Sequence, residues 1–393
     1  MDALRTFPIL YNLSKRELYE KIIQDVLDGK TGDIHPDAYQ AYSENLRKAV
    51  EGVFPQGNPG DPYFDLQAQL QANVSRFAAY KAYHLTEQLK KKHDEWGDGD
   101  DFKKVAKAVL NTFNRYQAAE YNTATARART AKQWTDFNSD PIANELYPNL
   151  KWLPSRSANP REEHIPFYGL VLPKTDPFWQ HNQPGNLWNC KCDWEETDDP
   201  AATTRPATIC AKGLEGNPAE TGEIFGENCT YFTQSGRNRR ERDITERKCE
   251  NATRPNIIKT ARERLLNTET QCMINGEYHS VMFISQGICE YAQSMQGVRN
   301  TYWLKNEILP KINDYIETSE CIGRKVSDTS HNTRPQTLRL KRNTDYFYYF
   351  KTELPDGNIV YLHLGRYKTG HERAGKFYLY TITKSLPENI ETP

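Results

Sequence analysis

The stretch REEHIPFYGLVLPKTDPFWQHNQPGNLWNCKCDW, residues 161–194, is the most distinctive part of the sequence. It is rich in proline and aromatic residues, and near its end two cysteines, Cys190 and Cys192, are separated by one lysine. Prolines at this density exclude long helices and favour a compact unit of loops and short strands. Because side chains two residues apart on a strand share a face, both sulfurs could reach one ion.

The cysteine pair has two interpretations. In the first, it ligates a structural zinc ion with two further residues, His164 as third ligand and Cys210 or His181 as fourth. In the second, both thiols are small apolar groups in a core. Structural zinc sites usually have two residues between paired cysteines, so a spacing of one is a weak signal and leaves both interpretations open.

The aromatic residues around the pair also have two interpretations. They are either rigid anchors for a protein partner or the filling of a small core that lacks regular elements. The residues concerned are Trp152, Phe167, Tyr168, Phe178, Trp179, Trp188 and Trp194.

The bulk properties indicate a multidomain protein. A chain of 393 residues exceeds one comfortable core, and 37% hydrophobic against 26% charged residues is polar but compatible with folding. The first thirty residues are charged and contain no long apolar run, so we expect no export signal, no membrane partner and a cytoplasmic environment. Eight cysteines in that environment favour metal ligation or burial over disulfides.

Helical periodicity dominates the region before the quoted stretch. Apolar residues recur at helical spacing in residues 14–27, 41–53, 65–92 and 102–133, and the last of these segments is rich in alanine. Small side chains let another helix approach closely. We therefore expect a helical N-terminal region, residues 1–58, followed by a domain of residues 59–196 that contains the proline-rich loop and strand module.

The quoted stretch resembles the phage Mu F-like, or MuF, head morphogenesis family. The matching positions are Arg161, Glu163, His164, Gly169, Leu172, Pro173, Asp176, Pro177, Phe178, Trp179, Pro184, Asn189, Cys190 and Cys192. Lys191 replaces the arginine that the family prefers, and QPGNLWN replaces its Pro-Pro-Asn-Gly-Trp-Asn. The alanine-rich segment 118–134 extends the resemblance upstream, so that it covers roughly residues 60–200.

The resemblance implies a minor head protein of a phage. Such a protein associates with portal and capsid proteins during assembly, lies in the capsid interior of the virion, and can be ejected with DNA. This implies a host cytoplasmic location during assembly.

The remaining chain divides into a linker and a second fold. Residues 197–270 are polar and then mildly basic, and we expect a linker there. Residues 271–393 predict a strand at 279–284, helices at 285–294 and 303–309, and three aromatic strands at 346–351, 359–365 and 377–383. The expected fold is thus α+β and multidomain, with a small antiparallel sheet in the C-terminal domain.

The order of elements in roughly residues 275–385 resembles phage-borne nucleases of the barnase, EndoU, colicin and RelE types. These folds cleave RNA without a metal, using an acid, a base and phosphate-binding cations. The candidates here are His331, His363 and His371 for proton transfer and Lys305 and Arg366 for phosphate.

Two functions follow from these resemblances. The first is a head morphogenesis protein with portal and capsid partners and packaged DNA as a further candidate. The alternative is a ribonuclease effector carried by the particle and acting on host RNA. No phosphate-binding loop, serine hydrolase elbow or zinc protease motif is present in the sequence.

Overall fold

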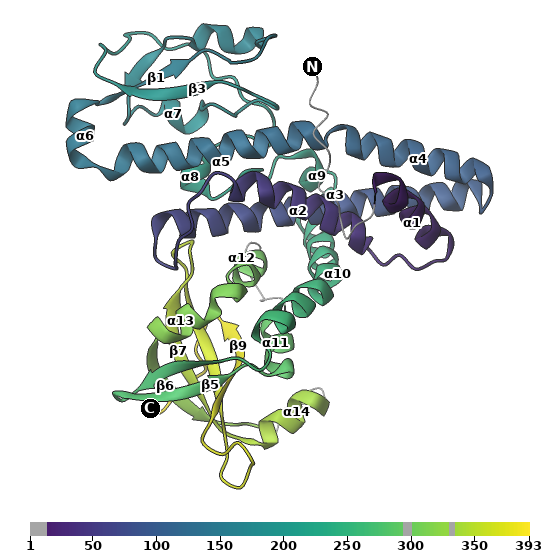
Figure 1. Ribbon diagram of the computed structural model, residues 1–393, viewed down its shortest axis with the longest axis vertical. Helices are drawn as coiled ribbons and strands as arrows, with labels where there is room; N and C mark the ends of the chain where they lie inside the picture. Colours follow the sequence, from purple (N-terminus) through teal and green to yellow (C-terminus); the bar gives the residue numbers. More distant parts are fainter. Residues whose placement is uncertain (1–13, 294–300, 330–334) are drawn as a thin grey trace. The chain divides into compact units, whose positions relative to one another are not determined.

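The computed structural model describes residues 14–293, 301–329 and 335–393 (Figure 1). Its contacts divide the chain into two compact units. The N-terminal unit contains the described residues up to Pro55 together with Gln69–Ala252, and the C-terminal unit contains Gln56–Ala68 together with Thr253–Pro393. The first unit is mainly helical and the second is built on a sheet, so the expected α+β multidomain class is confirmed.

The first helix, α1 (Lys15–Leu27), begins where the sequence predicts. The Ser14 hydroxyl accepts a hydrogen bond from the Glu17 amide, and the Glu17 carboxylate accepts one from the Ser14 amide. This reciprocal arrangement satisfies two amides that a helix start otherwise leaves without partners. Helix α2 (Pro36–Glu51) starts five residues before the predicted segment, because Pro36 supplies the backbone angle of a first helical residue.

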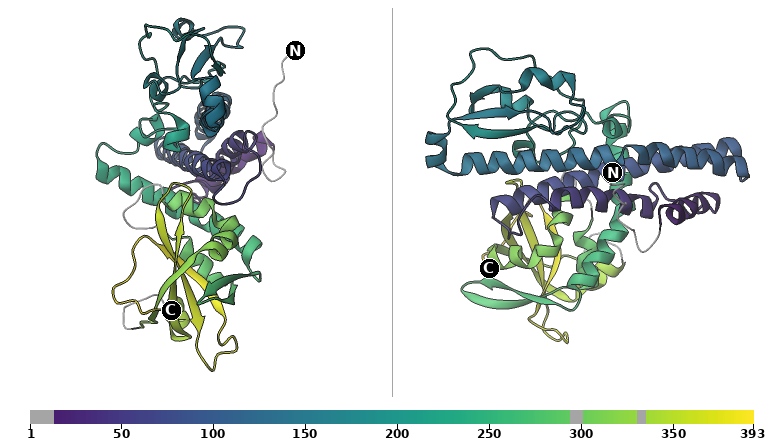
Figure 2. Two further views of the ribbon diagram at one scale, coloured as in Figure 1. Left: turned by 90° about the vertical axis from the view of Figure 1, so that its left-hand side faces the viewer. Right: turned by 45° about the horizontal axis from the view of Figure 1, so that its top comes forward.

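Three long helices complete the helical part, α3 (Pro62–Trp96), α4 (Asp100–Arg115) and α5 (Gln117–Ser139). The predicted helix at residues 102–133 is interrupted at Tyr116, which ends α4 and precedes α5. Figure 2 shows that α4 and α5 lie end to end, in nearly one line. The alanines Ala124, Ala128 and Ala131 of α5 are fully buried, and α5 packs against α2. No helix in the described part of the chain is long and apolar enough to span a bilayer.

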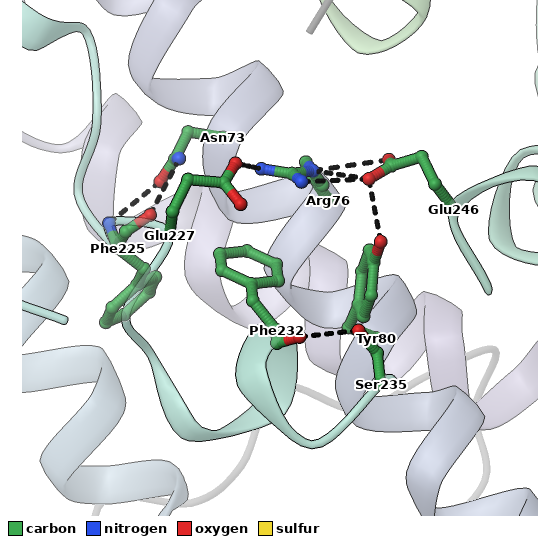
Figure 3. Close-up of polar contacts among 8 residues, drawn as sticks. All are labelled: Asn73, Arg76, Tyr80, Phe225, Glu227, Phe232, Ser235 and Glu246. Carbon is green, nitrogen blue, oxygen red and sulfur yellow. Dashed lines mark hydrogen bonds and ion pairs between the residues drawn. The ribbon is translucent and has the colours of Figure 1, made fainter. Parts of the chain in front are cut away.

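The segment 197–270 differs from the expected linker. It contains α8 (Pro218–Thr221), α9 (Thr230–Thr233) and α10 (Arg239–Leu265), and Phe225 and Phe232 are buried. Phe225 stacks on Phe77 of α3 with ring centroids 3.9 Å apart. Its amide and carbonyl both bond the side chain of Asn73 (Figure 3).

A buried ion pair also holds this segment to α3 (Figure 3). The guanidinium of Arg76 donates to the carboxylate of Glu246 at 2.8–3.2 Å and to that of Glu227 at 2.5 Å. It lies 4.4 Å from the ring centroid of Phe232, and the Tyr80 hydroxyl donates to Glu246. The polar composition of the segment is therefore compatible with packing, because Glu246 is buried where it pairs with Arg76.

The middle module follows α5 and matches the expected loop and strand character. After the short helix α6 (Pro141–Leu146) come β1 (Asn149–Leu153), the 3-10 helix η1 (Glu162–Phe167), β2 (Val171–Pro173), α7 (Phe178–His181) and β3 (Asp193–Thr197). The three strands form one antiparallel sheet in the order β2-β1-β3. We call residues 141–197 the middle module.

The C-terminal unit has a six-stranded sheet in the order β4-β5-β9-β8-β7-β6. Its strands are β4 (Glu269–Ile274), β5 (Glu277–Met282), β6 (Glu320–Val326), β7 (Thr344–Glu353), β8 (Ile359–Tyr367) and β9 (Phe377–Thr383). The predicted meander β7-β8-β9 is antiparallel. The whole sheet, however, is mixed, because β5 pairs with β9 in parallel.

Short helices accompany this sheet. They are α11 (Ser285–Tyr291), α12 (Thr301–Glu307), η2 (Leu309–Lys311), α13 (Ile312–Thr318) and α14 (Pro335–Arg342). Helix α11 packs on β9, and α13 packs on β4 and β7. The helix α11 approaches the strand so closely that a Cβ atom at Gly287 would lie 1.9 Å from the Leu379 carbonyl oxygen. Only glycine fits this position.

Candidate functional site

His164, Cys190 and Cys192 converge inside the middle module. His164 lies on η1, and the two cysteines lie in the loop that leads into β3. The Nδ1 atom of His164 is 3.4 Å from the Sγ atom of Cys190 and 3.4 Å from that of Cys192. All three side chains are buried, with His164 only 1% exposed. The structure therefore brings together three of the four metal-ligand candidates.

A hydrogen bond to Asn186 fixes the orientation of the imidazole. The Nε2 atom of His164 lies 3.1 Å from Oδ1 of Asn186. The amide nitrogen of Asn186 donates to the carbonyl of Ile209 at 2.7 Å, so its oxygen must face the histidine. Nε2 then carries the proton, and the lone pair of Nδ1 points toward the two sulfurs.

The surroundings of the sulfurs favour a thiolate. The hydrogen bond that the Cys192 thiol donates lowers the pKa of Cys190 to about 4. The same hydrogen bond and burial raise the pKa of Cys192, because both thiols cannot easily ionise together. The indole of Trp152 and the hydroxyl of Tyr168 oppose that rise in pKa. Both donor atoms are shielded from solvent and have no other hydrogen-bond partner.

The fourth candidate, Cys210, is not part of this cluster. Its Sγ atom donates to the carbonyl of Ala211, and burial raises the pKa of its thiol to about 11. The alternative fourth candidate, His181, is exposed at the end of α7. In the described ranges 14–293, 301–329 and 335–393, no further His, Cys, Asp or Glu joins the three converging ligands.

A second group, Asp25, His35 and Asp37, also places three ligand atoms close together. Here the ammonium of Lys21 pairs with Asp37 and lies 3.4 Å from Asp25, while Nε2 of His35 lies 3.1 Å from Asp25. A lysine cation thus already compensates these carboxylates. The group is best explained as an ion-pair cluster between α1 and α2.

The aromatic rings of the middle module mostly form its core. Trp152, Phe167 and Trp179 are fully buried, and Trp194 is 2% exposed. Trp152 packs edge-on against Phe167 with centroids 5.0 Å apart, and Trp179 packs against Trp194 at 5.7 Å. Of the two interpretations, core filling applies to these rings. They are not available as anchors for a partner.

The chain is similar to a curated phage protein. Over 133 residues it is 31% identical to the putative capsid assembly protein F of Escherichia phage Mu. The aligned stretch makes up 30% of this chain and 28% of that protein, so the chain spans less than a third of its relative's length. No protein-family model matches the chain, and no solved structure matches it. The match supports the resemblance to phage capsid assembly proteins.

In the C-terminal unit, the nuclease candidates have separate structural partners. His363 on β8 donates from Nε2 to the hydroxyl of Thr383 at 2.8 Å, because that hydroxyl itself donates to the carbonyl of Ser385. Its ring packs edge-on against Tyr349 at 4.5 Å. Burial lowers the pKa of His363 to about 4, which makes it a weak base at neutral pH.

The cationic candidates are also engaged. Arg366 is three residues from His363 on β8, hence on the opposite face of the sheet, and it donates to both carboxylate oxygens of Asp345 at 2.6–3.2 Å. Lys305 is buried and donates to the carbonyls of Tyr291 and Gln293, which connects α12 to α11.

The other described histidine of this set, His371, also has partners of its own. The ring of His371 stacks on Tyr367 with centroids 4.4 Å apart, and its Nδ1 accepts from the Arg373 amide. His331 lies outside the described residues. The candidates that lie in the described residues therefore do not form one constellation, and the resemblance of this region to nucleases stays a prediction.

Sequence analysis missed the residues that complete the candidate metal centre. Asn186, Trp152 and Tyr168 surround the imidazole and the sulfurs through hydrogen-bonding atoms. Trp152 and Tyr168 could be read only as aromatic residues, and a single asparagine in a loop has no spacing that marks it. The one available signal is general: a histidine that ligates a metal usually donates its second ring nitrogen to an oxygen, so a nearby polar side chain such as Asn186 is expected.

The lowered pKa of the half-buried His363 predicts acid sensitivity of the C-terminal unit. Its pKa is lowered from 6.5 to about 4, so between these pH values the unfolded chain binds the proton and the folded chain does not. We expect this contribution to stability to be complete above pH 6.5 and to decrease by about 2–3 kcal/mol as the pH falls to 4. Urea unfolding of the protein and of His363→Gln across this range measures the effect.

The variant His363→Gln should flatten the pH dependence, because glutamine has no group that titrates in this range. If the free energy of unfolding of His363→Gln and of the wild-type protein falls equally steeply as the pH is lowered, the His363 imidazole does not cause the acid sensitivity.

Proposed function

We propose that the chain is a head assembly protein of a phage. The observation that carries this proposal is the 31% identity to the putative capsid assembly protein F of phage Mu. The motif elements of residues 161–194, which resemble the MuF family, support the same assignment. The partners are then the portal and capsid proteins of the same phage, and the protein resides in the host cytoplasm during assembly and afterwards inside the capsid.

We place the contact with the capsid or portal on helix α6. This helix has no buried residue, and it exposes Ile142 and Leu146 at 70% and 60%. Tyr147, which directly follows the helix, is 44% exposed. Residues 142 and 146 lie four apart and therefore share one face of the helix. Adjacent exposed apolar side chains at the start of the middle module are the kind of surface that a protein partner covers.

Co-purification tests this proposal. The full chain, tagged and co-expressed with the portal and capsid proteins encoded in the same genome, should retain at least one of them through purification. The triple variant Ile142→Ser, Leu146→Ser and Tyr147→Ser should reduce the retained amount at least tenfold, because each substitution removes apolar area that the complex buries. Folding should be unaffected, since the three side chains are exposed.

The control is Trp96→Ser, which removes another exposed aromatic side chain of the N-terminal unit. It should co-purify as the unchanged protein does. If both variants lose the co-purifying partner equally, the effect comes from a more polar surface in general. If the triple variant still retains the partner, α6 is not the contact. Failure of the unchanged chain to bind either protein would contradict the proposed function.

A further inference from the structure

We propose that His164, Cys190 and Cys192 bind one soft divalent cation of the zinc type, which connects η1 to the loop that enters β3. The inference concerns the fold of the middle module and does not depend on the proposed role in head assembly.

The distances between the donor atoms fit one ion. In tetrahedral zinc coordination, Zn–S bonds of about 2.3 Å and Zn–N bonds of about 2.0–2.1 Å place sulfur and nitrogen about 3.6 Å apart. The two sulfur to nitrogen distances here are both 3.4 Å. All three donor atoms lie within 4.8 Å of one another. An ion could enter with only small shifts of the side chains.

The surroundings are those of a built site. A histidine that ligates a metal commonly donates its other ring nitrogen to an oxygen, which sets the direction of the ligating lone pair. Asn186 provides that oxygen, and Asn186 is itself fully buried and held by the Ile209 carbonyl. The amide of Cys192 donates to the sulfur of Cys190 at 3.4 Å, which favours the thiolate form of a ligand.

One further donor favours a charged sulfur at this site. Trp152 is completely buried. Its indole N–H lies near the Cys192 sulfur and has no other hydrogen-bond acceptor. A buried donor without a partner costs about 1–3 kcal/mol, whereas a donor beside a metal-bound thiolate is compensated. Two packed neutral thiols would leave this indole without an acceptor of comparable strength.

The chemistry of the donors selects the ion. Two thiolates and one imidazole favour zinc and related soft cations over magnesium or calcium, which prefer oxygen ligands. Three protein ligands leave one tetrahedral position, and within the described residues no fourth acidic, histidine or cysteine side chain reaches the group. A water molecule would complete the coordination. Binding must release the proton of the Cys192 thiol, so affinity should rise with pH.

The full chain, expressed with zinc and purified without chelator, tests the proposal by elemental analysis. We expect one zinc ion per chain, and Co²⁺ exchanged into the same protein should give thiolate-to-cobalt charge-transfer absorption. Cys190→Ser should remove both signals. The matched control is Cys229→Ser, because Cys229 is an equally buried thiol of the same unit that bonds the Gly213 carbonyl, and it should keep both signals.

A positioning variant separates ligation from folding. Asn186→Ala leaves all three donor atoms in place, and we expect it to weaken zinc binding on the order of 10–100-fold in competition with a chromophoric chelator. An unchanged protein without bound metal and without the cobalt band would overturn the proposal, even if Cys190→Ser failed to fold. A disulfide between Cys190 and Cys192 in protein kept under reducing conditions would overturn it too.

Discussion

Replacing Arg76 by methionine will lower the free energy of unfolding of the N-terminal unit by about 3–5 kcal/mol. Arg76 is 3% exposed and donates to Glu246, which is 6% exposed, and to the more exposed Glu227. Methionine fills much of the volume but leaves the Glu246 carboxylate buried without its cation. The cost is the desolvation of that charge, which the neutral hydrogen bond from Tyr80 does not offset.

Urea unfolding of the full chain, followed by helical circular dichroism, measures this change. The double variant Arg76→Met with Glu246→Leu should recover most of the lost stability, because it also removes the buried charge that Arg76 compensates. Arg16→Met is the control, since Arg16 and its partner Glu20 are 86% and 51% exposed and solvent replaces their contact. No loss in the single variant would mean that residues 197–250 do not pack on α3.

Replacing Trp152 by alanine will destabilise the middle module by about 3–5 kcal/mol. The indole is fully buried on β1 and contacts Phe167, Trp179 and the imidazole of His164. Alanine leaves a cavity at the centre of these rings, and short loops without regular elements have few ways to close it. The near-ultraviolet circular dichroism of the module's aromatic residues should also decrease.

Trp96→Ala is the control for this prediction, because Trp96 is 53% exposed at the end of α3. Its effect should stay within about 0.5 kcal/mol. Similar stability of Trp152→Ala and Trp96→Ala would show that residues 149–197 have no packed core of their own.

The parts of the fold that the sequence predicts are those set by local patterns. The start of α1 follows from the apolar residues at helical spacing behind Ser14, and the β7-β8 hairpin follows from the aromatic strand segments around the Pro355 to Gly357 turn. In the candidate metal centre, His164 and the two cysteines carry chemistry that marks them in any sequence. Local chemistry therefore predicts the three residues that converge but not their neighbours.

The parts that the sequence does not predict depend on contacts between distant residues. Phe225 packs on Phe77 across 148 positions, and Glu246 pairs with Arg76 across 170, so composition alone made residues 197–270 resemble a linker. Likewise, the sequence around Arg366 does not reveal that its guanidinium pairs with the carboxylate of Asp345. Cys210 has suitable chemistry for a ligand, but the fold places its thiol next to Ala211.

The measurement that tests the central claim most directly is the protein composition of assembling heads. Heads should be assembled from the capsid and portal proteins of the genome that encodes this chain, with and without the chain, and then purified and analysed by quantitative mass spectrometry. We predict that the chain is retained in the purified heads in a few copies each. Heads that form normally and contain none of it, although it is present and folded, would contradict the account.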